Sequence, residues 1–201
     1  MKLLTRTFAS AALAAALGGC SLGGLLGGGG KPPTTLQTLT AQAPDPGAVA
    51  RTVNAGQAVT ITTPTVPKEL RTVRVPAQIS ATDIQYVTNL QWVDTPDRLF
   101  QDLLEETVRR TTGRVVLDPL QPSVDPGLVV TGQLQRFGYD AATGQVVVVY
   151  DASLSTSGGN RVEARRFTAG VPSDGTGPSV GPALNSAANQ VAADVAKWIG
   201  G

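Results

Sequence analysis

Few residues in this 201-residue sequence could carry out covalent chemistry. The chain has no histidine and a single cysteine, Cys20. His-based triads, Cys-His pairs and metal sites built from several imidazoles or thiolates are therefore excluded. The lone thiol also has no partner for a disulfide within the chain. Its position, directly before the glycine-rich stretch LGGLLGGGG, is the first feature that needs an explanation.

The residues before Cys20 have the pattern of a secretory signal peptide. A basic start with Lys2 and Arg6 precedes the apolar run FASAALAAAL, which is shorter than the roughly 20 residues that a membrane span needs. The run leads into Leu-Gly-Gly-Cys, which resembles the bacterial lipobox. This resemblance implies that Cys20 receives a diacylglyceryl thioether and becomes the first residue after residues 1–19 are removed. The alternative is an ordinary signal peptide with a chance cysteine near its cleavage site.

The predicted acyl chains would hold the protein on a membrane. Each buried methylene contributes about 0.8 kcal/mol, so two or three chains anchor a protein firmly where one chain does not. Ser21 stands where an aspartate would favour retention at the inner membrane, and the resemblance therefore points to the inner leaflet of the outer membrane. Residues 20–33 are predicted to be a glycine-rich tether. They lack the spacing of a phosphate-binding loop, which is G-x-x-x-x-G-K-[ST].

Carboxylates are the remaining candidates for catalysis. Asp102, Glu105 and Glu106 lie together on a predicted helix that also carries three arginines. At helical spacing, solvated ion pairs explain this cluster better than a pair of catalytic acids does. The sequence therefore predicts a protein that is not an enzyme and that uses neither a metal nor a cofactor. Basic and acidic side chains nearly balance once the leader is removed, so nucleic acid is not favoured as a partner.

The rest of the chain predicts one α+β domain over residues 34–201. Alternating β-rich segments are separated by turn residues, and Pro67 and Pro76 favour positions at the edge of a sheet. We expect extended segments at 34–42, 57–63, 70–79, 84–93, 114–118, 127–140, 145–155 and 160–170. Two longer segments, 94–113 and 179–201, have apolar residues at helical spacing. The predicted fold is a mostly antiparallel sheet with both long helices packed on one face.

Each predicted helix has an identifiable buried stripe. In the first, Asp94 or Thr95 can cap the start, Pro96 suits the first turn and Gly113 can end the helix. The residues of this helix expected in the core are Phe100, Leu103, Leu104, Thr107 and Val108. The residues of the second helix expected in the core are Val180, Leu184, Ala187, Val191, Val195 and Trp198.

Two further groups of residues stand out as candidates for binding. Asn185 and Asn189, with Gln190 beside them, place amides on the flank or outer face of the last helix at i, i+4 spacing. They form either an ordinary exposed face or a docking surface for a partner, where amides can hydrogen-bond another chain without the desolvation cost of full charges. Tyr86 and Trp92 flank the segment before the first helix, and core packing is the favoured role for Trp92.

The folded region as a whole is similar to a known family. The segments VPKELRTVRVPAQI, IQYVTNLQWVDTPDRLFQDLLEETV, LVVTGQLQRFGYD and VVVYDASL occur in this order, followed by RRFTAG and ALNSAANQVAADVAKWIG. Together they resemble the auxiliary lipoprotein component of bacterial ABC-type transport systems, over roughly residues 34–201. The chain departs from the common pattern by having Leu36 and Leu39 where an aromatic-led Y-x-L start is frequent.

This resemblance implies a function without chemistry. Members of the family accompany lipid transporters of the MCE, Mla and paraquat-inducible class. The chain is thus expected to be an outer-membrane-anchored, periplasm-facing partner of an MCE-type substrate-binding protein and of the permease and ATPase that serve it. Two alternatives remain open. One is a general envelope-integrity lipoprotein, and the other is a periplasmic lipid-binding module, which would need an apolar cavity in place of a filled core.

Overall fold

The computed structural model describes residues 34–48, 50–52, 54, 56–120, 127–156 and 162–200. These residues belong to one compact unit, Pro33–Gly201. The predicted signal peptide, Cys20 and the tether lie outside the described residues. Within the described ranges, no helix combines the length and the apolar character that crossing a membrane requires.

The unit has the predicted α+β architecture, with one mixed sheet. Its described strands are β1 (Val59–Ile61), β2 (Arg74–Gln78), β3 (Ile84–Gln91), β4 (Val116–Leu117), β5 (Leu128–Asp140), β6 (Gln145–Thr156) and β7 (Val162–Pro172). The antiparallel ladders β5–β6 and β6–β7 are long, and β2–β3 is also antiparallel. The short strands β1 and β2 instead run parallel to β5, and β4 runs parallel to β1. The sheet is therefore mostly antiparallel but not purely so.

We expected Pro76 to place β2 at an edge of the sheet, and this prediction is wrong. This strand pairs with β3 on one side and with the end of β5 on the other. The register of the β2–β3 ladder shifts between Arg74 and Pro76. A proline lacks the N–H that a regular ladder would use, and an irregularity of this kind accommodates it inside a sheet.

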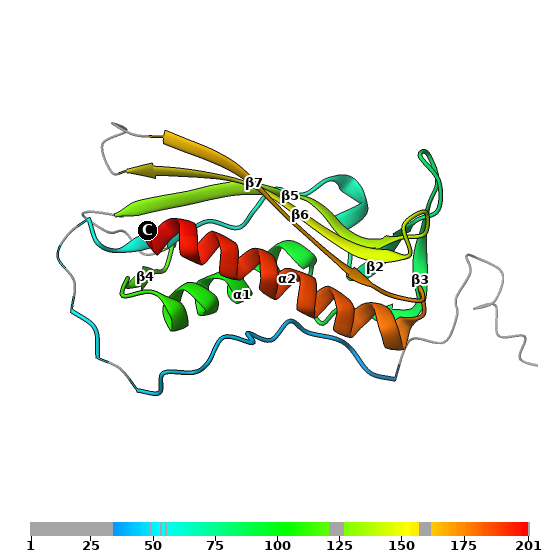
Figure 1. The fold of residues 1–201 in the computed structure, drawn as a ribbon, viewed down its shortest axis with the longest axis horizontal. Helices are drawn as coiled ribbons and strands as arrows, with labels where there is room; N and C mark the ends of the chain where they lie inside the picture. Colours follow the sequence, from blue (N-terminus) through cyan, green and yellow to red (C-terminus); the bar gives the residue numbers. More distant parts are fainter. Residues whose placement is uncertain are drawn as a thin grey trace, which may run out of the picture. The chain divides into compact units, whose positions relative to one another are not determined.

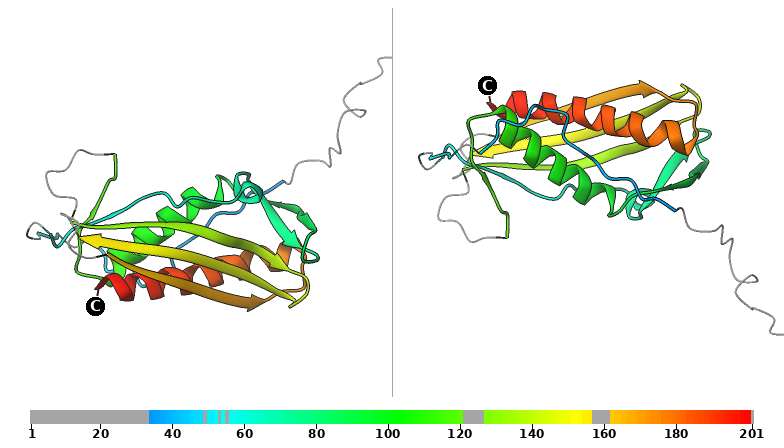
Figure 2. Two further views of the ribbon diagram at one scale, coloured as in Figure 1. Left: turned by 90° about the horizontal axis from the view of Figure 1, so that it is seen from above. Right: turned by 90° about the horizontal axis from the view of Figure 1, so that it is seen from below.

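Two long helices cover one face of the sheet (Figure 1, Figure 2). They are α1 (Pro96–Thr111) and α2 (Gly177–Gly200), and a short 3-10 helix, η2 (Lys68–Leu70), precedes β2. Every residue predicted for the buried stripe of α1 is buried, and of those predicted for α2 only Trp198 is partly exposed. The first helix starts at Pro96 as expected and ends at Thr111, before Gly113. The core lies between this helical layer and the sheet.

Aromatic side chains tie the helical layer to the sheet. The ring of Phe100 on α1 meets that of Tyr150 on β6 edge-on, with centroids 5.1 Å apart. Trp92 is buried as predicted, and its ring centroid lies 5.6 Å from that of Phe137 on β5. Tyr86 is half-buried beneath the guanidinium of Arg74. Such pairs contribute about 0.5–1.5 kcal/mol beyond the burial of their area.

The close approach of β2 to β5 yields a test of the fold. A Cβ added at Gly138 would overlap the backbone oxygen of Pro76. We expect Gly138→Ala to lower the free energy of unfolding by about 1–3 kcal/mol, because the strands must move apart to admit the methyl group. Gly113→Ala is the control, since nothing lies within 4 Å of its new methyl group. Urea denaturation of the two variants measures the effect, and equal midpoints would contradict the observed strand spacing.

Candidate functional site

Two of the three carboxylates in the predicted cluster on α1, Glu105 and Glu106, form ion pairs at helical spacing. Glu106 accepts a hydrogen bond from Nε of Arg110 at 2.6 Å, and it also pairs with Arg109. The bond from Arg110 is the main reason why the pKa of Glu106 lies below its usual value. Burial raises the pKa of Glu105, against the hydrogen bond that it accepts from Gln101. In the part of the chain that the structure describes, no cluster of three or more His, Cys, Asp or Glu could hold a metal.

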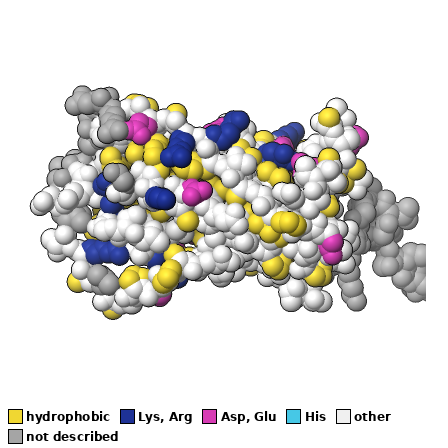
Figure 3. Space-filling view, in the orientation of Figure 1, with side chains coloured by type: hydrophobic (Ala, Val, Ile, Leu, Met, Phe, Trp, Pro, Cys, Tyr) yellow, Lys and Arg dark blue, Asp and Glu magenta, His cyan; other side chains and the backbone are white. Residues whose placement is uncertain are grey.

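Charged groups are dispersed over the surface shown in Figure 3. On that face, Lys and Arg side chains occur in small groups separated by neutral and apolar side chains. Individual pairs account for several of the charges, such as Arg136 with Asp140 at 2.9 Å. Exposed pairs of this kind contribute little to stability. The described face therefore has no continuous basic surface of the kind that binds nucleic acid.

The two predicted amides hold a segment from the other end of the domain. We call residues 37–43 the strap. It crosses the outer face of the helical layer, on the side away from the sheet (Figure 2). The backbone N–H of Thr40 donates to Oδ1 of Asn185 at 2.9 Å, and the N–H of Gln42 donates to Oδ1 of Asn189 at 2.7 Å. Nδ2 of Asn189 donates to the backbone oxygen of Thr40 at 2.9 Å and to that of Asn185 at 2.8 Å.

The spacing of these contacts follows from the geometry of the two backbones. Two residues of extended chain span about 6.7 Å. One helical turn of four residues spans about 6 Å. Thr40 and Gln42 on the strap therefore lie in register with Asn185 and Asn189 on α2. Side-chain amides here take the place of the neighbouring strand that an extended backbone usually pairs with.

Other contacts hold the strap at its two ends and along its inner side. The N–H of Gln37 donates to the backbone oxygen of Gln91 at 2.8 Å, and Arg110 donates to the backbone oxygen of Ala43 at 2.9 Å. Leu39 and Ala41 are partly buried against the core, as alternate residues of an extended segment can be. We expected residues 34–42 to be a strand. The segment is extended, but apart from an isolated bridge between Gln37 and Trp92 it joins no ladder.

The three residues predicted to dock a partner differ in their exposure to solvent. Gln190 is exposed and Asn185 is half-buried, whereas Asn189 is only 7% exposed. We placed Asn189 on the flank or outer face of α2, but its amide lies beneath the strap and is fully used in hydrogen bonds within the chain. The role of Thr40 and Gln42 was not visible in the sequence, because it depends on contacts between residues about 145 positions apart.

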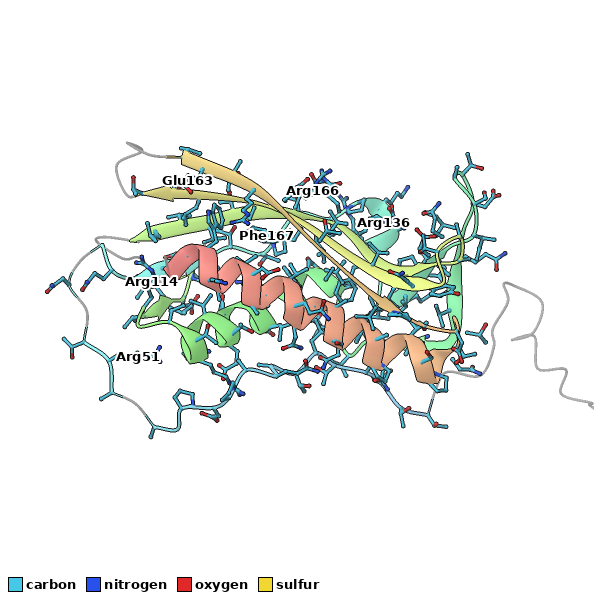
Figure 4. The ribbon with its side chains drawn as sticks, viewed as in Figure 1. Arg51, Arg114, Arg136, Glu163, Arg166 and Phe167 are labelled. Carbon is cyan, nitrogen blue, oxygen red and sulfur yellow. The ribbon has the colours of Figure 1, made fainter. Side chains whose placement is uncertain are left out.

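A second feature lies at the edge of the sheet, beside the C-terminal half of α2. Phe167 on β7 is buried against Trp198, with ring centroids 5.5 Å apart. Arg166, the next residue on the strand, lies on the opposite side of the sheet and pairs with Asp151 at 2.6 Å (Figure 4). Asp151 has a lowered pKa mainly because of this bond. The alternation of β7 thus directs Phe167 toward α2 and Arg166 away from it.

A hollow of about 900 Å³ lies between the C-terminal ends of the two helices. Its lining includes Thr52, Thr111, Thr112, Arg114 and Lys197. The guanidinium of Arg114 donates to the backbone oxygen of Ile199 at 3.0 Å, close to the end of α2. Pockets that hold lipid-like ligands are lined mainly by large apolar side chains, whereas this lining combines polar side chains with small alanines and glycines. The hollow therefore gives no support to a lipid-binding role for the domain.

These features define an α+β domain in which polar side chains form ion pairs on α1 and position the chain's own strap. The chain belongs to the ABC-type transport auxiliary lipoprotein component family, whose model matches residues 38–196. Family membership makes it an auxiliary component associated with an ABC-type transport system. It also places the chain among lipoproteins, which are anchored in membranes of the cell envelope.

Two solved structures are similar in fold. One is protein XCC0632 from Xanthomonas campestris, described as a DUF330 protein, with 18% identity and a TM-score of 0.63. The match covers 84% of this chain and 93% of that chain. The other is an uncharacterized protein with 18% identity and a TM-score of 0.60, and the match covers 82% of this chain and 99% of that one. No curated protein matches the sequence. At this level of identity, the two structures support the fold alone.

The buried amide of Asn189 yields a test of the strap. We expect Asn189→Ala to lower the free energy of unfolding by about 1–2 kcal/mol, because it removes the hydrogen bonds between the buried Asn189 amide and the backbone of Thr40 and Gln42. Gln190→Ala, at the exposed neighbouring position, should change it by no more than about 0.5 kcal/mol. Urea denaturation gives the energies, and hydrogen exchange at the Gln42 amide reports the strap directly. Unchanged exchange in Asn189→Ala would show that the amide does not hold the strap.

Proposed function

We propose that this protein is a lipid-anchored, periplasm-facing component of an ABC-type lipid transport system related to the MCE and Mla systems. The observation that carries the proposal is the family match over residues 38–196, together with the lipobox-like Leu-Gly-Gly-Cys that precedes it. Residues 1–19 act as the signal peptide, Cys20 carries the lipid, and residues 20–33 are the tether. Residues 34–201 form the auxiliary domain, and the anchor lies in the inner leaflet of the outer membrane.

The partners in this proposal are an MCE-type substrate-binding protein and, through it, the permease and the ATPase. The auxiliary domain supplies a binding surface rather than a reaction, and the ion pairs of Glu105 and Glu106 with arginines of α1 support this. Lipids cross the aqueous periplasm only inside a protein shell, so a component that docks such a shell suits this role. The filled core, and a hollow at the helix ends that has no large apolar side chain in its lining, favour docking over a cargo-holding function.

The docking surface in this proposal includes the flank of α2 that carries Asn185 and Gln190. Gln190 is exposed, and Asn185 keeps part of its surface accessible beside the strap. Asn189 contributes indirectly, since its amide fixes the strap that borders this flank. A partner on this flank would thus contact both α2 and the strap.

The anchor is tested by changing the residue that carries it. We expect Cys20→Ala to abolish acylation and to release the protein from membranes or stall its precursor, because no other residue can receive the thioether. Ser21→Asp is the companion variant, and it should move an acylated protein to the inner membrane. Fractionation with metabolic labelling by palmitate measures both outcomes. Normal processing of Cys20→Ala, with continued sedimentation in the outer membrane, would show that the lipobox interpretation is wrong.

The proposed docking surface is tested by adding a charge at its exposed residue, Gln190. We expect Gln190→Arg to weaken co-purification with the proposed MCE-type partner by about tenfold, since an unmatched charge at an interface costs more than about 1.4 kcal/mol. Thr143→Arg, in the exposed β5–β6 turn, adds the same charge elsewhere and should have no effect. Both variants should keep the parent's urea midpoint. Undiminished co-purification would move the interface off this flank, and a neighbourhood without MCE, permease and ATPase genes would argue against the transport class.

A further inference from the structure

The strand β7 leaves one long edge of the sheet open. Its eleven residues pair with β6 from Val162 to Pro172, and in the described part of the chain they pair with no other strand. Figure 2 shows β7 at the border of the sheet, alongside α2. The outer edge of such a strand presents a row of backbone N–H and C=O groups, which is a template for a further strand. Short edge strands avoid this, whereas β7 is nearly as long as β6.

A hollow lies directly beside this edge. Its volume is about 430 Å³, and it opens between β7 and the C-terminal half of α2. Phe167 and Trp198 provide its apolar surface, with ring centroids 5.5 Å apart. The indole of Trp198 donates to the carboxylate of Glu163 at 3.1 Å, which fixes the ring at the border of the hollow. A strand added to β7 would direct alternate side chains to this side of the sheet.

The charge around the hollow favours an acidic occupant. Arg165 lies over the ring of Phe167 at 5.3 Å, and Lys197 is exposed one position before Trp198. Among the residues that the structure describes, neither cation forms an ion pair. Two carboxylates face the same region, Asp194 in the lining and Glu163 at the indole of Trp198.

Arg166 also borders the hollow, but its side chain lies on the opposite side of the sheet, where Asp151 holds it at 2.6 Å and 2.7 Å. Apart from Arg166, the charged side chains of the lining are the two cations Arg165 and Lys197 and the carboxylate of Asp194. A carboxylate placed beside Arg165 and Lys197 would gain two charge-assisted hydrogen bonds.

We propose that the free edge of β7 binds an extended segment of a partner polypeptide by strand addition, with an Asp or Glu of that segment in the hollow between Arg165 and Lys197. Strand addition draws affinity from backbone hydrogen bonds and specificity from pockets for alternate side chains, and this edge offers both. An anionic lipid headgroup would satisfy the cations but not the row of backbone donors and acceptors. The proposal does not depend on the transport function proposed above.

A second copy of this chain is a poorer occupant than an acidic strand. Pairing two β7 edges antiparallel in a register centred on Arg165 and Arg166 would set the arginines of one copy opposite those of the other. Like charges that face each other across a strand pair are destabilising. The arginines thus discourage self-association at the edge, while they admit a strand of opposite charge.

Two synthetic peptides test the proposal on the full-length mature protein in detergent. The probe is the amide-capped heptapeptide TVTETVT, and its matched control is TVTKTVT. We expect the glutamate peptide to bind about tenfold more tightly than the lysine peptide and to slow hydrogen exchange in residues 162–172. Lys197→Glu should abolish this preference, whereas Lys68→Glu makes the same charge change at a residue outside the hollow and should preserve it. Fluorescence anisotropy of labelled peptide gives the affinities.

Several results would overturn the proposal. Equal binding of the two peptides would contradict the preference for an acidic side chain. Protection from exchange outside β7 would show that the peptide does not bind at the β7 edge. If exchange in residues 162–172 becomes slower as the protein concentration increases, with no peptide present, the edge binds a second copy of the chain. Vesicles of phosphatidylglycerol that protect β7 where the peptides do not would assign the cations to a lipid surface. Protection of β7 by the glutamate peptide, lost in Lys197→Glu, is the result that supports strand addition.

Discussion

The fold depends on α2 being buried along most of its length. Its alanines are small enough to let the helix approach β6 and β7 closely, and Ala187, Ala188 and Ala192 are fully buried. The first helix packs along one side of it, and the strap crosses its outer face. The buried residues of such a helix are expected to be apolar. Asn189 is the exception among the buried residues of α2, and a buried amide must find its partners inside the protein, since leaving it unpaired costs about 1–3 kcal/mol. The strap supplies those partners.

The elements that the sequence predicts well are those specified by local pattern. The stripe of Phe100, Leu103, Leu104, Thr107 and Val108 needs only helical periodicity, and α1 buries all five residues. The hairpins that join β5, β6 and β7 are also local, with Gly144 in the left-handed region at the first turn. The parallel pairs of β1 and β2 with β5 join residues far apart in the chain. The local sequence pattern does not indicate whether a distant strand pairs parallel or antiparallel. The parallel pairs of the sheet were therefore not predicted.

The candidate site shows the same division between local and distant information. The i, i+4 spacing of Asn185 and Asn189 predicted two amides on one side of α2 that could hydrogen-bond another chain. What spacing could not indicate is that the chain's own strap is bound there. The β-rich composition of residues 34–42 predicted an extended backbone, and the strap is extended. Its partners are side chains of a helix rather than a strand, because the outer face of a helical layer offers no open backbone groups for pairing.

The strap and the β7 edge present the same physical requirement in two environments. Each is an extended backbone whose N–H and C=O groups need partners. On the strap, the amide of Asn189, which is only 7% exposed, and the backbone groups of Thr40 and Gln42 satisfy one another, so the contact is structural and its loss is costly. On β7, the outer groups face solvent, and water satisfies them at little cost until another backbone replaces it. Backbone groups that are hydrogen-bonded within the protein stabilise the fold, whereas backbone groups that are hydrogen-bonded only to water remain available for binding. By this criterion the amides of α2 belong mainly to the architecture, and the edge beside Phe167 and Trp198 belongs to recognition.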